Sequence, residues 1–474
     1  MIKLDYRKFV EKLLIKKKGT LLKYQNTKFN LKSISQKRDF GILLNDISFY
    51  QFYKNFKSQN THKLIEPISS KYARNFSNHE KKIKLKLNLK NILGFFLKNE
   101  FIYNLNFFIN GIFSKKINLK KNFFFCFVHK PKLLNYVVPI FKKLNLRCIF
   151  VVMSHKQQKE LKLKKSETIL LPSINVFQTS FFYDDEAIIK FYVKSSYKLL
   201  SKYKPKFIFT VEGDHPYAES LALVAKKFKI SSICLQWGVS PRKEPKVSFM
   251  NMSNDYFISW GKFFSKQLKP FNKNTKFLDY GNFNFIKKKN KINKVLFILQ
   301  PHDYSLTKKY FQNLYLLASN LANRFNNWKF VVREHPDYQC EDLFDDEFIK
   351  KSKKVYIEKY NDKTIDNSLS EAKLVVGIWS SSLLEGLFYG AIPCVLQLNN
   401  NFKYYPDFKK MNIGLVEKNI NKMELKIINF LENKKHFNNF QYKIREKNKK
   451  IFSKKNGKYS KNKIINFLNI QGQI

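Results

Sequence analysis

The fold is decided by two stretches of this chain, Val331-Val332-Arg333-Glu334-His335-Pro336 and Gly377-Ile378-Trp379-Ser380-Ser381-Ser382-Leu383-Leu384-Glu385. Each begins as an apolar run typical of a buried strand and then turns abruptly polar. Because ligands bind at the carboxyl ends of strands in an open parallel sheet, these polar residues are candidates for a site. The serines also lead into a helical pattern, so hydroxyls and unpaired backbone N–H groups meet at a helix N-terminus, which favours phosphate.

Strands and helices alternate along the rest of the chain. One series of apolar, strand-like runs falls at residues 123–128, 148–153, 207–211, 232–236 and 256–260. A Lys-rich run at 287–291 interrupts the pattern, and a second series begins at 295–299. Such alternation specifies parallel sheets covered on both faces, so we expect an α/β protein with two doubly wound, Rossmann-like domains that face a cleft.

The expected domains divide the chain into four parts. Residues 1–115 are rich in Lys, Asn and Phe, contain no motif, and are interpreted as a helical N-terminal extension. Residues 116–286 form the first Rossmann-like domain, which holds the acceptor, and 292–440 form the second, which holds the nucleotide. Residues 441–474 form C-terminal helices, of which the last is expected to pack back across the first domain.

The amino-acid composition indicates which kinds of partner the protein can bind. The net charge is +53, but eight of the 89 basic residues are Arg, the residue that reads phosphates and bases through bidentate contacts. This scarcity disfavours nucleic acid as a partner. Dispersed Lys is sufficient for attraction to anionic lipid head groups, so an anionic membrane surface stays open as a partner.

Other features of the sequence bear on the compartment. The five cysteines have neither disulfide-framework nor metal-ligand spacing, which favours a reducing compartment. The N-terminus lacks the apolar core of a signal peptide, and no apolar run reaches the length of a membrane-spanning helix. We therefore expect a cytoplasmic protein, with a peripheral position at the inner membrane face left open.

The nucleotide would be held by residues of the second domain. A strand-end histidine such as His335 can hydrogen-bond a phosphate or a ribose, and the following proline directs it outward. Glu385, one turn into the helix, is placed to accept ribose hydroxyls. The alternatives are an ordinary surface loop at His335 and simple helix capping by the serines. The predicted nucleotide-binding residues are Arg333, His335, Ser380, Ser381, Ser382 and Glu385.

Catalysis would fall to residues of the first domain. Glu212, Asp214 and His215 follow the strand at 207–211. A carboxylate there can take the proton of an acceptor hydroxyl, and His215 can share or replace that role. The alternative is that Asp214 caps the helix that begins near Pro216. His302, after the first strand of the second domain, either lines the same cleft or lies in an exposed loop.

These residues resemble a known family. His335-Pro336, the serine turn and then Glu385, Gly390 and Pro393 are similar in order to the donor-binding half of GT-B glycosyltransferases of bacterial capsule and lipopolysaccharide synthesis. Related arrangements occur in sialyltransferases, Kdo transferases and polyglycerolphosphate transferases. In the first domain, Leu235-Gln236-Trp237-Gly238 resembles their Gln-His-Gly element, with Trp237 in place of His. The resemblance covers about residues 120–440.

The resemblance extends to a third element and implies further roles. Residues 255–261, followed by Asp279-Tyr280-Gly281-Asn282, resemble the family's Asp, Trp-Gly and Gly-Asn series. Sialyltransferases use an acidic residue as general base, which implies that role for Glu212 or Asp214. The residues implied to line the acceptor side of the cleft are Gln236, Trp237, Gly238, Gly281 and Asn282.

We therefore expect a glycosyltransferase that moves a sugar from a nucleotide-sugar donor to a surface-polysaccharide or lipid-linked acceptor. No Asp-x-Asp motif or His/Cys cluster occurs, so we expect neither a metal nor another cofactor. One alternative is a sugar-nucleotide 2-epimerase of the same fold, although those enzymes have Ser-Gly-Gly where this chain has three serines. Another is a non-catalytic basic protein that binds an anionic polymer or a membrane.

Overall fold

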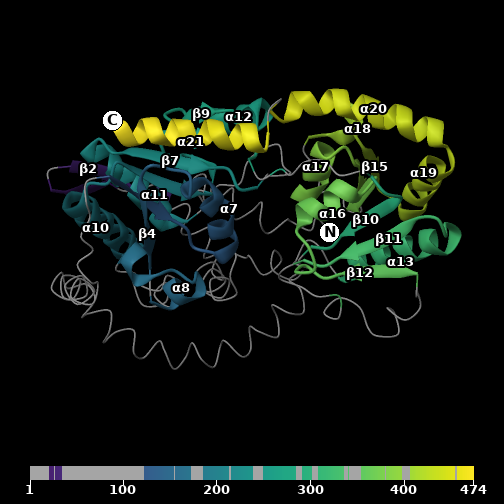
Figure 1. Ribbon diagram of the computed structural model, residues 1–474, viewed down its shortest axis with the longest axis horizontal. Coiled ribbons are helices and arrows are strands. Elements are labelled where there is room, and N and C mark those ends of the chain that lie inside the picture. The colour runs from purple at the N-terminus through teal and green to yellow at the C-terminus, as the bar shows by residue number, and fades with distance from the viewer. Residues whose placement is uncertain are drawn as a thin grey trace, which may run out of the picture.

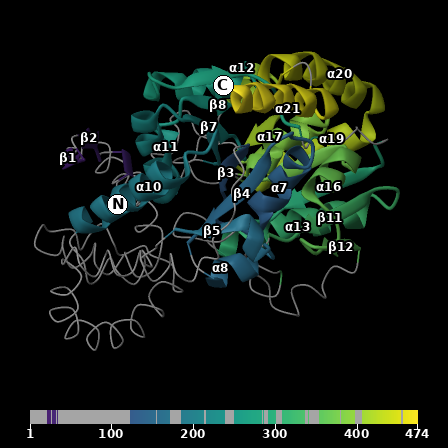
Figure 2. The same ribbon diagram turned by 60° about the vertical axis from the view of Figure 1, so that its left-hand side comes forward.

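The structure, a computed structural model, describes residues 21–25, 27–31, 33–34, 122–153, 155–171, 185–212, 215–238, 249–283, 285, 291–300, 308–335, 340, 354–378, 380–397, 406–453 and 456–474. Within these ranges two parallel sheets, each covered by helices, form two domains side by side (Figures 1 and 2). The expected α/β architecture with two Rossmann-like domains is confirmed.

The first domain is built on a sheet with the strand order β5-β4-β3-β6-β7-β8-β9. Its strands are β3 (Phe123–Phe127), β4 (Arg147–Val152), β5 (Thr168–Leu170), β6 (Phe207–Val211), β7 (Ser231–Leu235), β8 (Tyr256–Ile258) and β9 (Lys276–Leu278). Its helices are α7 (Pro131–Phe141), α8 (His155–Glu160), α10 (Asp185–Tyr203), α11 (Pro216–Ala225) and α12 (Lys262–Leu268). Short 3-10 turns occur at Lys165–Glu167, Lys226–Phe228 and Lys269–Phe271.

The second domain is built on a sheet with the strand order β12-β11-β10-β13-β14-β15. Its strands are β10 (Lys294–Ile298), β11 (Lys329–Arg333), β12 (Val355–Glu358), β13 (Leu374–Gly377), β14 (Ile392–Leu396) and β15 (Leu415–Glu417). Its helices are α13 (Lys308–Arg324), α16 (Ile365–Glu371), α17 (Ser381–Phe388), α18 (Phe408–Met411), α19 (Ile420–Glu432) and α20 (Lys434–Ile451).

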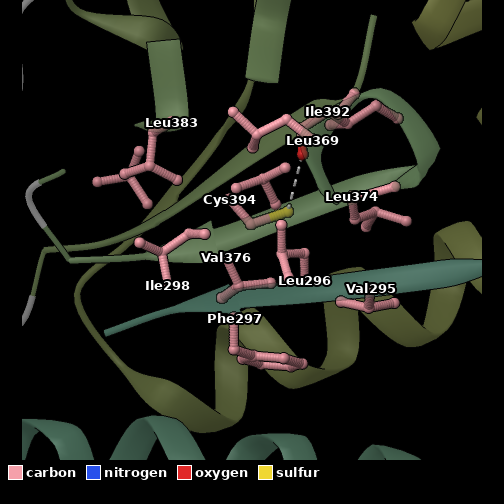
Figure 3. Close-up of a cluster of buried hydrophobic side chains, with 14 of the residues drawn as sticks. Val295, Leu296, Phe297, Ile298, Leu369, Leu374, Val376, Leu383, Ile392 and Cys394 are labelled. Atoms are coloured by element: carbon pink, nitrogen blue, oxygen red, sulfur yellow. Dashed lines mark hydrogen bonds between the residues drawn. The ribbon is translucent and has the colours of Figure 1, made fainter. Parts of the chain in front are cut away.

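The cores explain why the central strands are apolar on both faces. In β3, Phe123, Phe125 and Phe127 join one buried cluster, whereas Phe124 and Cys126 join another on the opposite face of the sheet. In the second domain, Val295, Leu296 and Phe297 of β10 lie beside Val376 of β13 (Figure 3). Side chains alternate between faces along a strand, so a central strand covered by helices on both sides has no polar face.

Each sheet has a switch point, where the chain direction through the strand order reverses. In the first sheet it lies between β3 and β6, because the chain proceeds from β3 to β4 but from β6 to β7. In the second sheet it lies between β10 and β13. Ligands of open α/β sheets bind outside the carboxyl ends of the strands at such points.

The C-terminal helices belong to different domains. Ile444 and Ile451 of α20 lie in the core of the second domain. The last helix, α21 (Lys458–Gln473), inserts Ile464 and Leu468 into the core of the first. The two helices run along one side of both domains in Figure 1. The expectation that the last helix returns to the first domain is confirmed, but the expected unit 441–474 is divided, and α20 begins before residue 441.

The crossing between these helices is tied to the first domain. The Ser453 N–H donates to the carbonyl of Trp260 at 2.9 Å, and the Gly457 N–H donates to the carbonyl of Asn282 at 3.0 Å. Gly261 lies so close to the crossing that a Cβ there would be 2.8 Å from the carbonyl oxygen of Ile451. The backbone contact at this point therefore requires glycine.

Within the first 115 residues, the structure differs from the expected helical extension at residues 21–24 and 27–30. Strands β1 (Leu21–Tyr24) and β2 (Thr27–Asn30) form an antiparallel hairpin instead of a helix. Leu22 and Phe29 are buried in the core of the first domain. Ser33 donates to the buried carboxylate of Glu219 in α11. These residues are thus part of the first domain. The Phe-rich stretch at 92–113 lies outside the described residues.

Among the described residues, no helix is sufficiently long and apolar to cross a membrane.

Candidate functional site

The serine turn lies at the switch point of the second sheet. Ser380 is the N-cap of α17 and accepts a hydrogen bond from the Ser382 N–H at 3.2 Å. Ser380 is buried, whereas Ser381 and Ser382 are partly exposed. β13 ends at Gly377, so the turn lies directly beyond the carboxyl end of the strand. Ser380 therefore caps the helix, and its hydrogen bond also fixes the backbone that carries the hydroxyls of Ser381 and Ser382.

Glu385 lies one turn into α17 and has an unusual environment. Burial, followed by the negative charge of Asp366, raises the pKa of Glu385 to about 8, although the hydrogen bond with Ser381 opposes this rise. Burial also raises the pKa of Asp366, whose carboxylate accepts a hydrogen bond from Tyr389 at 2.6 Å. The carboxyl groups of Glu385 and Asp366 therefore lie close together beside the serine turn of the second domain, and Glu385 is mainly neutral at pH 7.

His335 lies beyond the end of β11 and is partly exposed. Its neighbour Glu334 is buried and accepts a hydrogen bond from the Cys340 N–H at 2.9 Å. β11 and β13 flank β10 in the sheet, so His335 and the serine turn lie on either side of the end of β10. The structure thus brings two of the predicted nucleotide-binding elements to the same edge of one sheet. Pro336 and His302 lie outside the described residues.

Contrary to expectation, the side chain of Arg333 does not face this edge of the sheet. Its side chain is buried, and its guanidinium donates to Glu358 and, at 3.3 Å, to the hydroxyl of Ser368. It also donates to the carbonyl oxygens of Tyr360 at 3.0 Å and Lys363 at 2.8 Å. These contacts join β11, β12 and α16. They give the guanidinium a structural role, so the proposed contact of Arg333 with nucleotide has no support from its position.

A buried ion-pair network surrounds Glu358. The Lys294 ammonium lies 3.3 Å from the Glu358 carboxylate and 3.7 Å from that of Glu371. Burial lowers the pKa of Lys294, against the opposing charge of Glu358. Beside it a cavity of about 360 Å³ is lined by residues of β10, β11, β12 and α16, including Tyr356, and by residues of the segments before β10 and α16, including Lys363. The lining includes neither the serine turn nor His335, so this cavity is separate from the switch point.

At the switch point of the first sheet, two histidines meet. His215 is the N-cap of α11, and its Nδ1 accepts a hydrogen bond from the Tyr217 N–H at 3.2 Å. His129, two residues beyond β3, lies against it with ring centroids 5.0 Å apart. The cap that was considered for Asp214 is therefore made by His215. Asp214 lies outside the described residues, and Glu212 is partly exposed with a left-handed φ of 73°.

The predicted acceptor residues form a hub around Tyr136 of α7. The Tyr136 hydroxyl lies 3.2 Å from the carbonyl oxygen of Gln236 and 3.3 Å from Oδ1 of Asn282, and it can donate its single proton to either. The Trp260 indole N–H donates to the Gln236 carbonyl at 3.2 Å. The ring of Trp237 meets Tyr136 edge-on with centroids 4.7 Å apart. The structure thus brings Gln236, Trp237 and Asn282 together.

Many hydrogen-bonding groups of this hub have partners within the protein. The Gln236 side chain accepts from the Trp260 N–H at 2.9 Å and donates to the carbonyl of Gly238 at 2.9 Å. Gly281, with φ 91°, accepts from the Ser460 hydroxyl at 2.8 Å. These residues support the domain boundary and the C-terminal crossing. Of the predicted set, Trp237 and Gly238 are partly exposed.

Tyr136 also faces the second domain. Burial raises the pKa of its phenol, and the charges of Asp366 and Glu385 raise it further, against a hydrogen bond with Trp260. The carboxyl groups of Asp366 and Glu385, in the second domain, therefore lie close to Tyr136 of the first domain. Sequence reasoning missed Tyr136, Asp366, Tyr389 and His129. Only His129 carried a usable signal, as an ionisable residue just past a buried strand.

Within the described residues, no group of three or more His, Cys, Asp or Glu side chains is arranged to hold a metal ion. A metal-independent reaction stays a prediction.

Comparison with known proteins identifies the fold. No protein-family model matches the chain, and no curated protein matches it. A Listeria monocytogenes protein proposed to be a UDP-N-acetylglucosamine 2-epimerase is similar in structure, with TM-score 0.52 and 11% identity over 75% of this chain and 97% of that one. The UDP-GlcNAc 2-epimerase from Neisseria meningitidis, bound to UDP-GlcNAc, has TM-score 0.51 and 12% identity over 73% of this chain and 99% of that one. The wall teichoic acid polymerase TagF has TM-score 0.50 and 12% identity over 82% of this chain and 97% of that one.

At these identities the likeness establishes architecture. The chain has the GT-B fold, with two Rossmann-like domains, as the resemblance at the level of sequence motifs implied.

Proposed function

We propose that this protein is a glycosyltransferase that moves a sugar from a nucleotide-sugar donor to a surface-polysaccharide or lipid-linked acceptor. The observation that carries the proposal is the serine turn at the switch point of the second domain, with Glu385 one turn into the same helix. The turn offers hydroxyls, and the N-terminus of α17 offers a positive dipole to the phosphate of a nucleotide.

The donor binds to the second domain. Ser381 and Ser382 contact the phosphates, His335 donates to a phosphate or ribose oxygen, and Glu385 binds the ribose hydroxyls. No divalent cation takes part in this proposal. The charge that develops on the leaving nucleotide is stabilised by the α17 dipole and by His335. The acceptor binds against the first domain, near Trp237 and Gly238.

The acceptor defines where the enzyme works. A growing glycan or a lipid-linked sugar is found at the inner face of the membrane, so we propose that the protein is cytoplasmic and attaches peripherally to that face. The net charge of +53, supplied almost wholly by Lys, supports attraction to an anionic surface.

The experiment combines purified full-length protein with UDP-, GDP-, CDP- and CMP-linked sugars and a membrane extract from the source organism. We expect free nucleotide to be released and labelled sugar to enter the extract, with transfer much faster when the extract is present. Absence of transfer from every donor would refute the proposed function.

A sugar-nucleotide 2-epimerase is the second candidate, since two of the structures with the same fold are described as such enzymes. An epimerase requires no acceptor. It breaks the C2–H bond, so incubation of UDP-N-acetylglucosamine in deuterated water without extract would introduce deuterium at C2. We expect no such exchange. Ser382, where the epimerases have glycine, supports this expectation.

A further inference from the structure

The cavity of about 360 Å³ lies over one face of the second sheet, towards its β12 edge. Val331 and Tyr356 are paired across β11 and β12, and Lys329 is two residues before Val331, so these three side chains point to the same face. The cavity is separate from the serine turn, so an occupant here is not the donor nucleotide. Its volume falls in the lower part of the range of about 300–1,000 Å³ that is usual for small-molecule sites.

The charged groups around the cavity are balanced. The ionisable lining residues are Lys294, Lys329, Lys363, Glu358, Asp362 and Glu371. Three ammonium and three carboxylate groups leave no net charge, so neither an anion nor a cation is strongly favoured as the occupant. A sugar hydroxyl both donates and accepts hydrogen bonds, and it can therefore use both kinds of group.

Two of these groups keep hydrogen-bonding capacity for a ligand. Within the part of the chain that the structure describes, the buried Lys294 ammonium donates one hydrogen bond, to Glu358 at 3.3 Å, while the carboxylate of Glu371 lies 3.7 Å away. An ammonium has three N–H donors, and a buried donor without an acceptor is costly. The exposed carboxylate of Asp362 accepts the Lys359 N–H through one oxygen, at 2.9 Å. The cavity thus offers both donors and acceptors.

Two exposed apolar side chains also line the cavity. Tyr356 is 58% exposed and Ile292 is 47% exposed, so both can contact a ligand that enters from solvent. The Lys329 ammonium lies 4.4 Å from the centroid of the Tyr356 ring. An aromatic ring beside flexible charged groups suits a sugar, because the C–H groups of the sugar pack on the ring while its hydroxyls reach the charged groups.

We propose that this cavity is a second, carbohydrate-binding site that takes one neutral sugar unit, either free or within a glycan. The sugar packs against Tyr356, its hydroxyls accept hydrogen bonds from Lys294 and Lys329, and one hydroxyl donates to Asp362. No covalent step takes place here. The site goes beyond the proposed transferase reaction and does not depend on it.

Saturation-transfer NMR of the full-length protein tests the site, with the methyl glycosides of glucose, galactose and mannose as probes. We expect at least one glycoside to bind and its uronic acid and amino-sugar counterparts to bind more weakly. A saturating mixture of UDP, GDP, CDP and CMP should not displace it. A trisaccharide of the same sugar that binds as tightly as the glycoside indicates a glycan as the occupant, whereas weaker binding indicates a free sugar, and either result supports the site.

Substitutions of the exposed tyrosine locate the bound sugar. Tyr356→Ala should weaken glycoside binding at least about fivefold, whereas Tyr356→Phe, which keeps the ring, should stay within about twofold of wild type. Tyr442→Ala is the matched control, because Tyr442 is also exposed but lies on α20. It should leave glycoside binding unchanged.

Three results would overturn the proposal. They are the absence of binding by every glycoside, tighter binding of a charged counterpart, and wild-type affinity in Tyr356→Ala. None of these bears on the transferase function, which is judged separately by sugar transfer from the nucleotide donors. A protein that transfers no sugar but loses glycoside binding in Tyr356→Ala would refute that function and keep the carbohydrate site.

Discussion

The ring of Phe285 stacks on the ring of Phe388, with centroids 3.7 Å apart and planes 21° apart. Phe285 comes from the end of the first domain, and Phe388 is the last residue of α17. The stack therefore ties the connection between the domains to the helix that begins with the serine turn. Tyr389 and Phe452 contact the same Phe285 ring, at 5.5 Å and 5.6 Å.

Removal of this ring should be costly. We expect Phe285→Ala to lower the free energy of unfolding by about 3–4 kcal/mol, because a buried aromatic side chain leaves a cavity. Urea denaturation measures the change. Tyr442→Ala is the control, since Tyr442 is 68% exposed and its loss should cost less than about 0.5 kcal/mol. Equal effects of the two substitutions would show that the stack does not stabilise the protein.

Arg333→Met tests the structural role of the guanidinium. Because Glu358 would stay buried without this partner, we expect a loss of about 3–5 kcal/mol in unfolding free energy. The matched control is Arg324→Met, whose ion pair with Glu432 at 2.8 Å is half exposed and is worth less than about 1 kcal/mol. Nucleotide affinity of the folded Arg333→Met protein should stay within about twofold of wild type. A large affinity loss without destabilisation would return Arg333 to the nucleotide site.

Glu385 should make stability depend on pH. Its pKa of about 8 in the folded protein exceeds the ordinary 4.5, so its stabilising contribution is complete below pH 4.5 and is lost as the pH rises through 8. Glu385→Gln cannot ionise. We therefore expect the difference in thermal midpoint between Glu385→Gln and wild type to favour the variant increasingly from pH 5 to pH 8.5. A difference that does not change with pH would contradict the raised pKa.

Substitution of Ser380 can separate helix capping from anion binding. Aspartate is as good an N-cap as serine, so Ser380→Asp should keep the stability of α17 within about 0.5 kcal/mol. Its negative charge should repel a phosphate and weaken nucleotide binding by at least about tenfold. Ser380→Ala should do the opposite, with about 1 kcal/mol of lost stability and a smaller loss of affinity. Ser380→Asp with full affinity would mean that the serine acts only as a cap.

The central strands and switch points were predictable because each central strand is buried on both faces and reads as an unbroken apolar run. The run at 123–128 contains β3, and the one at 207–211 is β6. The edge strands β5, β9 and β15 were not predicted. Each has three residues and pairs on one side only, so its sequence carries too little apolar signal.

The candidate site was predictable only in part. The serine turn follows from a local pattern, a strand end beside a helix start. Arg333 has the same local signature as His335, yet it turns inward because Glu358 on the neighbouring strand pairs with it. The pairing of His129 with His215, and the approach of Tyr136 to Glu385, depend on strand order and domain packing. Neither can be derived from sequence spacing alone.

Calorimetric titration of the full-length protein with UDP, GDP, CDP and CMP tests the central claim most directly. We predict that at least one nucleotide binds with a stoichiometry of one per chain. His335→Ala and the Ser380→Ala/Ser381→Ala double variant should each weaken this binding by at least about tenfold, whereas His436→Ala should leave it unchanged. Failure of all four nucleotides to bind, or wild-type affinity in both site variants, would contradict a nucleotide site at the serine turn of the second domain.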